Sequence, residues 1–307
     1  MSLEKRIRGF DHLGSRFSHE RLDRVLIGYK IPDELFKRFQ TAAATYISRC
    51  LPGEQYTLSD EDLMQRLEKH YSEIQNITPN GMMVPKRHLN VEYNLLVKSF
   101  ADIIASCNIN DLVSSWHVPL NLRVKLGQAD DANLLRHHPT EHIHSDSWAG
   151  ESSESVTTHI PIFGDVERNH LTFFSPPDDF QEEWLGALPS YRDGGHIAER
   201  YNHLDVIPQK GYLYFHDFSG LHSSHRFPNA GARVTLDTTF VLNRPEPILG
   251  TEHPWRENER ATNETLSSLG DQKLFYFPDT NEEFVDSEGG FKHPTNLHIL
   301  DLEPKNG

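Results

Sequence analysis

The segment EHIHSDSWAGE, at residues 141–151, carries three side chains of types that bind transition metals. His142, His144 and Asp146 are spaced two apart, so on a β-strand all three leave the same face. Imidazole nitrogens and carboxylate oxygens both ligate divalent metals. The same row also describes the polar side of an ordinary strand. A bare His-x-Asp is weak evidence, since His203 and Asp205 repeat it.

A third ligand for the first copy is available at His222, in the segment GYLYFHDFSGLHSSHRF. Two histidines and one carboxylate with open positions form the facial triad of non-haem Fe(II) oxygenases. His225 is the alternative third ligand, but at an odd separation from His222 on a strand it faces the other way. His203 and Asp205 lie in a polar loop stretch without a suitably distant third ligand, so we interpret that copy as structural.

An anion-binding pair follows the third ligand. Arg233 and Thr235 lie two apart on an expected strand, ARVTLDTTFVL, and therefore share a face. A guanidinium binds a carboxylate bidentately, and a hydroxyl two residues on can add a third hydrogen bond. The pair is suited to the distal carboxylate of a dicarboxylate cosubstrate. Arg226 is a weaker alternative to Arg233, because it shares the strand of the metal ligand.

The elements that must position these side chains follow from hydrophobic periodicity. Helical stripes lie at 35–47, 63–74 and 95–107, and from about residue 116 the period changes to two. Short strands are expected at 120–126, 141–148, 155–163, 171–174, 212–216, 221–227 and 232–242. Gly, Pro, Asn and Asp clusters between them predict an antiparallel sandwich or barrel.

We expect residues 1–307 to form a single domain. It divides into a helical flank (1–115), a β core (116–245) with a long insertion (176–210), and a C-terminal extension (246–307). Long insertions in compact domains are often lids or binding elements.

Composition limits the partners. Thirty basic against 45 acidic residues give a formal charge of −15, which disfavours nucleic acid and anionic membrane surfaces. The chain has two cysteines, too few for a disulfide framework. The N-terminal residues are charged where a secretory signal peptide needs an apolar core. A cytoplasmic protein without a membrane span is the expectation.

Three segments together resemble the Fe(II)- and 2-oxoglutarate-dependent dioxygenases. They are HSD at 144–146, GYLYF…GLH ending at His222, and ARVT at 232–235. The resemblance covers roughly residues 116–242. It implies an α+β, mainly β fold: a double-stranded β-helix (jelly roll, cupin-like) flanked by N-terminal helices. By the same resemblance His144, Asp146 and His222 bind iron, and Arg233 with Thr235 holds the 2-oxoglutarate C5 carboxylate.

The resemblance also implies an activity. Enzymes of this family use O2 to decarboxylate 2-oxoglutarate to succinate and CO2, and usually hydroxylate an unactivated C–H bond. Family halogenases have a small residue in place of the carboxylate, so Asp146 argues against halogenation. The local style looks most like the phytanoyl-CoA-hydroxylase-like and small-molecule group. The expected substrate is therefore a natural product, an amino acid or a sugar.

Two other functional classes remain open. Metal-binding cupins pair histidines as His142 and His144 do, but they place a glutamate where this chain has Trp148 and Ala149. A non-catalytic jelly roll that binds a ligand is the second alternative, because fold does not fix function.

Several neighbouring residues have two interpretations. Trp148 either walls the substrate pocket or fills the barrel mouth, and Thr157 with His159 either contacts ligand or fills the interior. Asn121, Arg123 and Lys125 are expected on a solvated outer face, with contact to the C1 carboxylate or to substrate as the alternative.

Overall fold

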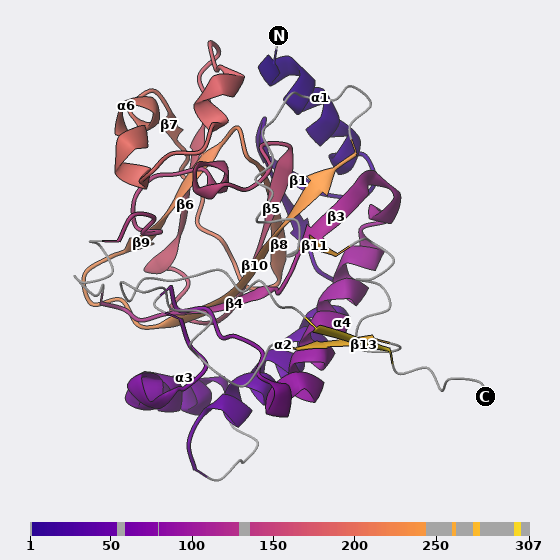
Figure 1. Ribbon diagram of the computed structural model, residues 1–307, viewed down its shortest axis with the longest axis vertical. Helices are drawn as coiled ribbons and strands as arrows, with labels where there is room; N and C mark the ends of the chain where they lie inside the picture. Colours follow the sequence, from indigo (N-terminus) through magenta and orange to yellow (C-terminus); the bar gives the residue numbers. More distant parts are fainter. Residues whose placement is uncertain are drawn as a thin grey trace.

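The computed structural model describes residues 2–53, 59–78, 80–128, 136–243, 260–261, 273–276 and 298–301. It consists mainly of antiparallel strands with helices on one side (Figure 1). The predicted C-terminal extension lies largely outside the described residues. Its apolar run forms β12 (Lys273–Tyr276), which pairs with β13 (His298–Asp301).

Two sheets carry the expected core. The larger one has the order β1-β2-β8-β5-β10-β3-β11, with β4 also paired to β10. The smaller one has the order β7-β6-β9 and stands across from β5, β8 and β10 in Figure 1. The strands of the larger sheet are β1 (Glu20–Asp23), β2 (Leu26–Lys30), β3 (Val113–His117), β4 (Asn121–Lys125), β5 (Ser155–Gly164), β8 (Tyr212–Asp217), β10 (Arg233–Leu242) and β11 (Arg260–Ala261). Those of the smaller sheet are β6 (Asn169–Ser175), β7 (Asn202–His203) and β9 (Leu221–Arg226).

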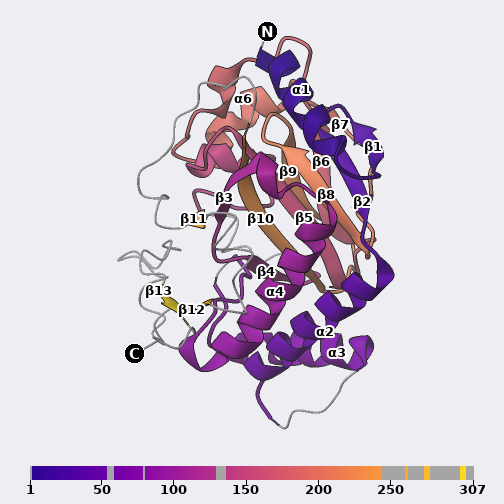
Figure 2. The ribbon, with the colours of Figure 1, turned by 90° about the vertical axis from the view of Figure 1, so that its right-hand side faces the viewer.

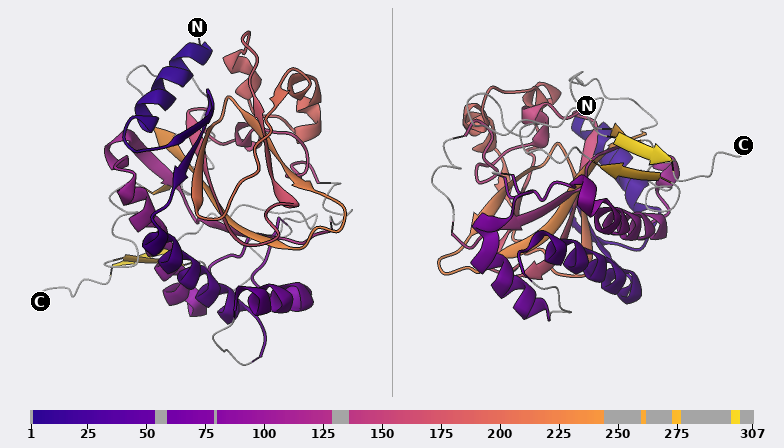
Figure 3. Two further views of the ribbon diagram at one scale, coloured as in Figure 1. Left: turned by 180° about the vertical axis from the view of Figure 1, so that it is seen from behind. Right: turned by 60° about the horizontal axis from the view of Figure 1, so that its bottom comes forward.

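The three predicted helical stripes are confirmed as α2 (Asp33–Cys50), α3 (Asp60–His70) and α4 (Asn90–Ser106). They lie together on one side of the larger sheet, as the side view in Figure 2 and the two views in Figure 3 show. Ser59 caps α3 by accepting a hydrogen bond from the Asp62 N–H at 3.1 Å. The prediction of a core-facing stripe was wrong for one residue of the third helix. Leu95 is 50% exposed, because it lies on the outer face of α4.

Period-two alternation decides what each strand presents to the two sides of the larger sheet. On β5 and β10, Val156, Ile160, Val234 and Leu236 pack into the core with the helices. The intervening side chains point the other way, into the space between the sheets. The interior is therefore apolar on the helix side and polar on the side of the smaller sheet.

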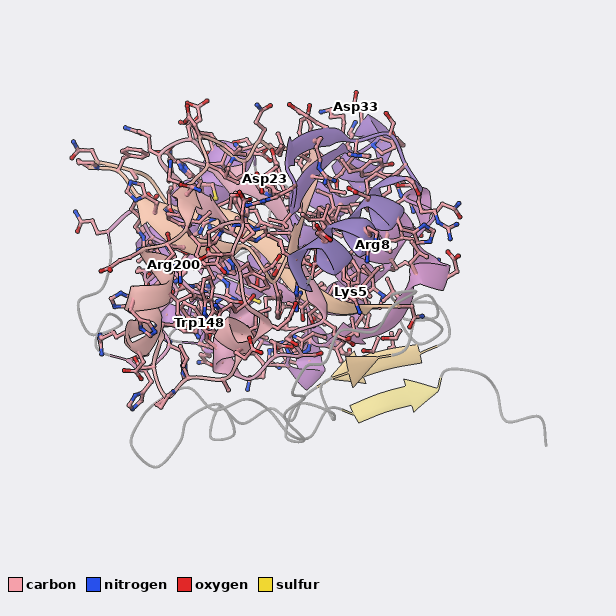
Figure 4. The ribbon with its side chains drawn as sticks, turned by 90° about the horizontal axis from the view of Figure 1, so that it is seen from above. Lys5, Arg8, Asp23, Asp33, Trp148 and Arg200 are labelled. Atoms are coloured by element: carbon pink, nitrogen blue, oxygen red, sulfur yellow. The ribbon has the colours of Figure 1, made fainter. Side chains whose placement is uncertain are left out.

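The N-terminal segment contains elements that the sequence did not predict. Helix α1 (Ser2–Gly14) precedes β1 and β2, which extend the larger sheet at one edge. The insertion folds into η5 (Glu182–Leu185), η6 (Tyr191–Gly194) and α6 (Gly195–Ala198). In the view from above in Figure 4, Trp148 and Arg200 lie on the left of the molecule, and Lys5 and Arg8 of α1 lie on its right. Among the described helices, none has the length and apolar character of a membrane span.

Candidate functional site

Three side chains predicted as metal ligands meet between the two sheets. Their ligand atoms all lie within 4.8 Å of one another. Asp146 Oδ1 is 3.6 Å from His144 Nε2 and 3.8 Å from His222 Nε2. Both histidines are buried, whereas the Asp146 side chain is 28% exposed. The predicted third ligand, His222, is therefore placed with the other two.

The local structure that presents the first two ligands differs from the expected strand. His144 makes only an isolated bridge to His222, and Asp146 begins the 3-10 helix η4 (Asp146–Ala149). Ser145 caps this helix by accepting from the Ser147 N–H, and Gly150 ends it with φ of 97°. Asp146 is thus placed by a capped turn, not by strand alternation, and His142 does not join the ligand group.

The protonation of the three groups suits a divalent cation. The His142 carbonyl accepts a hydrogen bond from His144 Nδ1 at 2.7 Å, so Nε2 is the nitrogen that faces Asp146. Burial, together with the neighbouring His144, lowers the pKa of His222 to about 3, and that imidazole is neutral. Burial alone would raise the pKa of Asp146, but the two histidines hold it well below its usual range. The site therefore contains a neutral imidazole at His222 and an ionised carboxylate at Asp146, with His144 Nε2 beside them.

Arg233, at the other end of the same space, is a buried cation with open hydrogen-bond donors. It is 1% exposed and donates from Nη2 to Ser224 Oγ at 3.2 Å. Its Nε and Nη1 have no hydrogen-bond partner among the described residues. Burial and the charge of Arg226 lower its pKa to about 9. An unpaired buried guanidinium is costly, which indicates that an anion belongs here.

One cavity of about 40 Å³ joins the two ends. Thr235, the predicted partner of Arg233, lines it and is 1% exposed. The remaining lining residues are Arg123, Thr140, His144, Asp146, Thr157, His159, Leu171, His222, Ser224, Arg233 and Asp237. All five predicted site residues therefore border a single cavity.

Arg123, on the polar face of β4, lines this cavity, so the expected assignment of that face to a solvated outer side was wrong. Arg123 donates from Nε and Nη2 to the two carboxylate oxygens of Asp237, each at 3.0 Å. Asn121 also donates to Asp237, at 3.1 Å. Burial would lower the pKa of Arg123, but Asp237 raises it. The alternation in LNLRVKL predicts that these polar residues share one face of the strand, but it does not indicate whether that face points into the protein.

Lys125 points to the anion-binding end from the same strand. It is 5% exposed and donates to Thr140 Oγ1 at 2.8 Å and to Glu141 Oε1 at 3.3 Å. The Arg226 guanidinium also donates to Glu141 Oε1, from two nitrogens at 3.1 Å each. Arg226 was the weaker alternative to Arg233. Because Glu141 already pairs with Arg226, its guanidinium is not the open cation of the cavity.

His159 is the lining residue whose role the sequence left open. It is 2% exposed, and neither ring nitrogen has a hydrogen-bond partner among the described residues. Burial, with the charge of Arg233 next, lowers its pKa well below the ordinary value, so it is neutral. It lies on β5 opposite Asp237, two positions after Thr157, which donates to Asp146 Oδ2 at 3.5 Å.

The other candidates lie elsewhere. His203 and Asp205 are exposed, as is His225. Trp148 is fully buried and donates from Nε1 to the Trp184 carbonyl at 2.7 Å, so it fills the fold instead of lining the cavity.

Comparison with known proteins gives similarity only at the level of solved structures. No family model matches the chain, and no curated protein does. A structure described as the non-heme alpha ketoglutarate dependent carbocyclase SnoK from nogalamycin biosynthesis matches with a TM-score of 0.40 and 13% identity, over 98% of each chain. EctD from S. alaskensis, with 2-oxoglutarate and 5-hydroxyectoine, matches at 0.37 and 12%, over 75% of this chain and 78% of its own. An N-substituted L-amino acid dioxygenase from Burkholderia ambifaria matches at 0.34 and 13%, over 75% and 85%.

These are oxygenases of the family that the sequence motifs resemble. At such identities and TM-scores the likeness carries no argument about the activity of this chain.

Proposed function

We propose that this protein is a non-haem Fe(II)- and 2-oxoglutarate-dependent dioxygenase that hydroxylates a small molecule and releases succinate and CO2. The main observation behind the proposal is that one cavity has a candidate metal-binding group at one end and a candidate anion-binding arginine at the other. One end has two imidazoles and a carboxylate, and the other has a buried guanidinium with two open nitrogens. The two facing sheets would be the walls of a double-stranded β-helix.

The donor set fits iron. His144, Asp146 and His222 would hold Fe(II) as a facial triad, since they supply two nitrogens and one oxygen from a single side. The orphaned Nε2 of His144 supports this reading, because a buried acceptor without a partner is otherwise unfavourable. The bound iron would supply open coordination positions at which 2-oxoglutarate and dioxygen react.

The opposite end fits the distal carboxylate of 2-oxoglutarate. Arg233 would bind it through its two open nitrogens, with the Thr235 hydroxyl beside it. His159, neutral and unpartnered, would donate a further hydrogen bond toward the cosubstrate from the wall between the two ends. Asp237 neutralises Arg123, so Arg233 is left as the open cation among the described lining residues.

Charge matching supports the same ligand pair. Asp146 and Asp237 balance Arg123 and Arg233 along the lining. Fe(II) and the 2-oxoglutarate dianion carry equal and opposite charges, so adding both leaves the buried cavity neutral. An uncompensated charge in a buried site would be costly.

Succinate formation tests the proposal. The purified protein, supplied with Fe(II), 2-oxoglutarate and O2, should produce succinate by uncoupled turnover, and more of it when a true substrate is present. A cupin enzyme would bind metal without consuming 2-oxoglutarate, and a non-catalytic jelly roll would bind ligand without producing succinate. Absence of turnover with intact metal binding would reject the dioxygenase assignment.

A further inference from the structure

The imidazole of His144 is stacked against an aromatic ring from the insertion. The Tyr191 ring lies 4.1 Å from it, centroid to centroid, at an interplanar angle of 18°. Tyr191 is 4% exposed. The face of the imidazole is therefore held by Tyr191, while its Nδ1 edge is held by the His142 carbonyl at 2.7 Å. These two contacts restrict both rotation and tilt of the ligand ring.

Tyr191 is itself fixed by a capped turn. The Ser190 side chain accepts from the Arg192 N–H, and Asp193 accepts from the Ser190 N–H at 3.1 Å, which completes a capping box. The turn is also bonded to the chain ahead of the metal ligands. The His137 carbonyl accepts from the Tyr191 N–H at 3.0 Å and from Ser190 Oγ at 2.7 Å.

The same insertion also forms hydrogen bonds with the chain on the C-terminal side of His144 and Asp146. The Leu188 N–H donates to the Trp148 carbonyl at 2.9 Å, and Trp148 Nε1 donates to the Trp184 carbonyl at 2.7 Å. Gly194 packs so closely that a Cβ there would lie 2.3 Å from the Trp148 ring. The insertion therefore holds the ligand-bearing segment at 137 and at 148, with His144 and Asp146 between these points.

A buried ion-pair cluster anchors the insertion to the rest of the fold. Arg6 of α1 is 0% exposed, and its Nε donates to Glu182 Oε1 at 2.6 Å. Its Nη1 donates to Asp217 Oδ1, at the end of β8, at 3.0 Å. The insertion, which the sequence suggested as a lid or a binding element, is thus bonded to α1 and to the segment that carries His144 and Asp146, and its contacts are those of a fixed support.

We infer that Tyr191 is a positioning residue for the metal ligand His144, held in place by the insertion. This inference rests on the proposed function, since it concerns the same metal site. A metal site tolerates displacement of its ligands by only about 0.5 Å and 10–20°. Neighbours that orient a ligating histidine are correspondingly important for metal affinity, at about 10–100-fold when they are removed. Tyr191 acts through ring packing, in addition to the hydrogen bond from His144 Nδ1 to the His142 carbonyl.

Binding of Co(II), a spectroscopic substitute for Fe(II), tests this inference in the full-length protein. Tyr191→Leu should weaken Co(II) binding by about tenfold or more and alter the visible ligand-field bands of the complex. Tyr191→Phe keeps the stacked ring and should match the wild type in both measurements. Tyr201→Leu is the matched control, because Tyr201 is a buried tyrosine of the same insertion in the aromatic cluster around Trp148.

The outcomes separate the two proposals. Wild-type affinity and spectrum in Tyr191→Leu would overturn the role of Tyr191, as would equal losses in Tyr201→Leu or in Tyr191→Phe. Wild-type protein that binds neither Co(II) nor Fe(II) would instead contradict the proposed function itself. If Tyr191→Leu does not fold by circular dichroism, Tyr191→Met, which removes the ring but fills more of its volume, replaces it with the same expected results.

Discussion

His144 and His222 exchange both of their main-chain hydrogen bonds, each 2.9 Å long, across an isolated antiparallel bridge. One residue precedes η4 and the other lies on β9, so the bridge joins two distant parts of the chain. Backbone pairing thereby sets the separation of the two imidazoles, while η4 sets the position of Asp146. Main-chain contacts therefore hold these side chains together, and each part of the site can be tested separately.

Removing the carboxylate ligand should abolish the metal site. We expect Asp146→Ala to lose Fe(II) and Co(II) binding by calorimetry and to lose succinate formation, because two imidazoles without the carboxylate bind a divalent cation weakly. Asp205→Ala, in the exposed second His-x-Asp, is the control and should behave as wild type. Normal succinate production by Asp146→Ala would contradict the assignment.

Removing the buried guanidinium should affect the cosubstrate but not the metal. Arg233→Ala loses charge-assisted hydrogen bonds worth about 3 kcal/mol, so the KM for 2-oxoglutarate should rise about 100-fold while the Co(II) dissociation constant stays unchanged. Arg226→Met gives the comparison, because Glu141 already pairs with that guanidinium. A larger rise in KM for Arg226→Met than for Arg233→Ala would reverse the roles of the two arginines.

His159 should contribute one hydrogen bond to cosubstrate binding. His159→Leu removes the donor and is expected to raise the KM for 2-oxoglutarate about tenfold, from the loss of about 1.5 kcal/mol. His159→Gln keeps a donor and should recover most of the affinity. Unchanged steady-state kinetics in His159→Leu would mean that the imidazole only fills space.

Lys125 should make stability depend on alkaline pH. Burial lowers its pKa in the folded protein from the ordinary 10.5 to about 7, so between these values the unfolded chain binds more protons. The free energy of unfolding should therefore rise with pH through that window and gain nothing from Lys125 below it. Urea unfolding of Lys125→Met, measured across the window, should show a smaller rise than the wild type. Parallel curves for the two proteins would contradict the expectation.

The Arg6 cluster should be important for stability. Arg6→Met leaves the carboxylates of Glu182 and Asp217 without this partner in a buried setting, which typically costs about 3–5 kcal/mol. Arg16→Met breaks a surface pair with Asp111, whose side chain is 62% exposed, and should cost about 1 kcal/mol or less. Urea denaturation measures both, and equal effects would show that the cluster has no special role.

Local patterns in the sequence determined the elements and the main site residues. Stripes such as Phe39, Ala43 and Tyr46 predicted α2 because one face of a helix must be apolar to pack. Alternation likewise predicted β5 and β10. The ligand set and the Arg233–Thr235 pair followed from residue type and spacing, since the chemistry they suggest requires those groups.

Long-range packing decided the rest. Alternation on β4 showed that Arg123 and Lys125 share a face, but only pairing with β10, together with helices on the opposite side, turned that face inward. The segment at 144–146 became a capped turn because Ser145 and the bridge to His222 outweighed a short period-two pattern. The stacking of Tyr191 on His144 joins the insertion to the metal ligand through space, and a contact between such distant residues leaves no periodic trace in the chain. Spacing thus identified the candidate metal ligands, and tertiary contacts decide how these side chains are held.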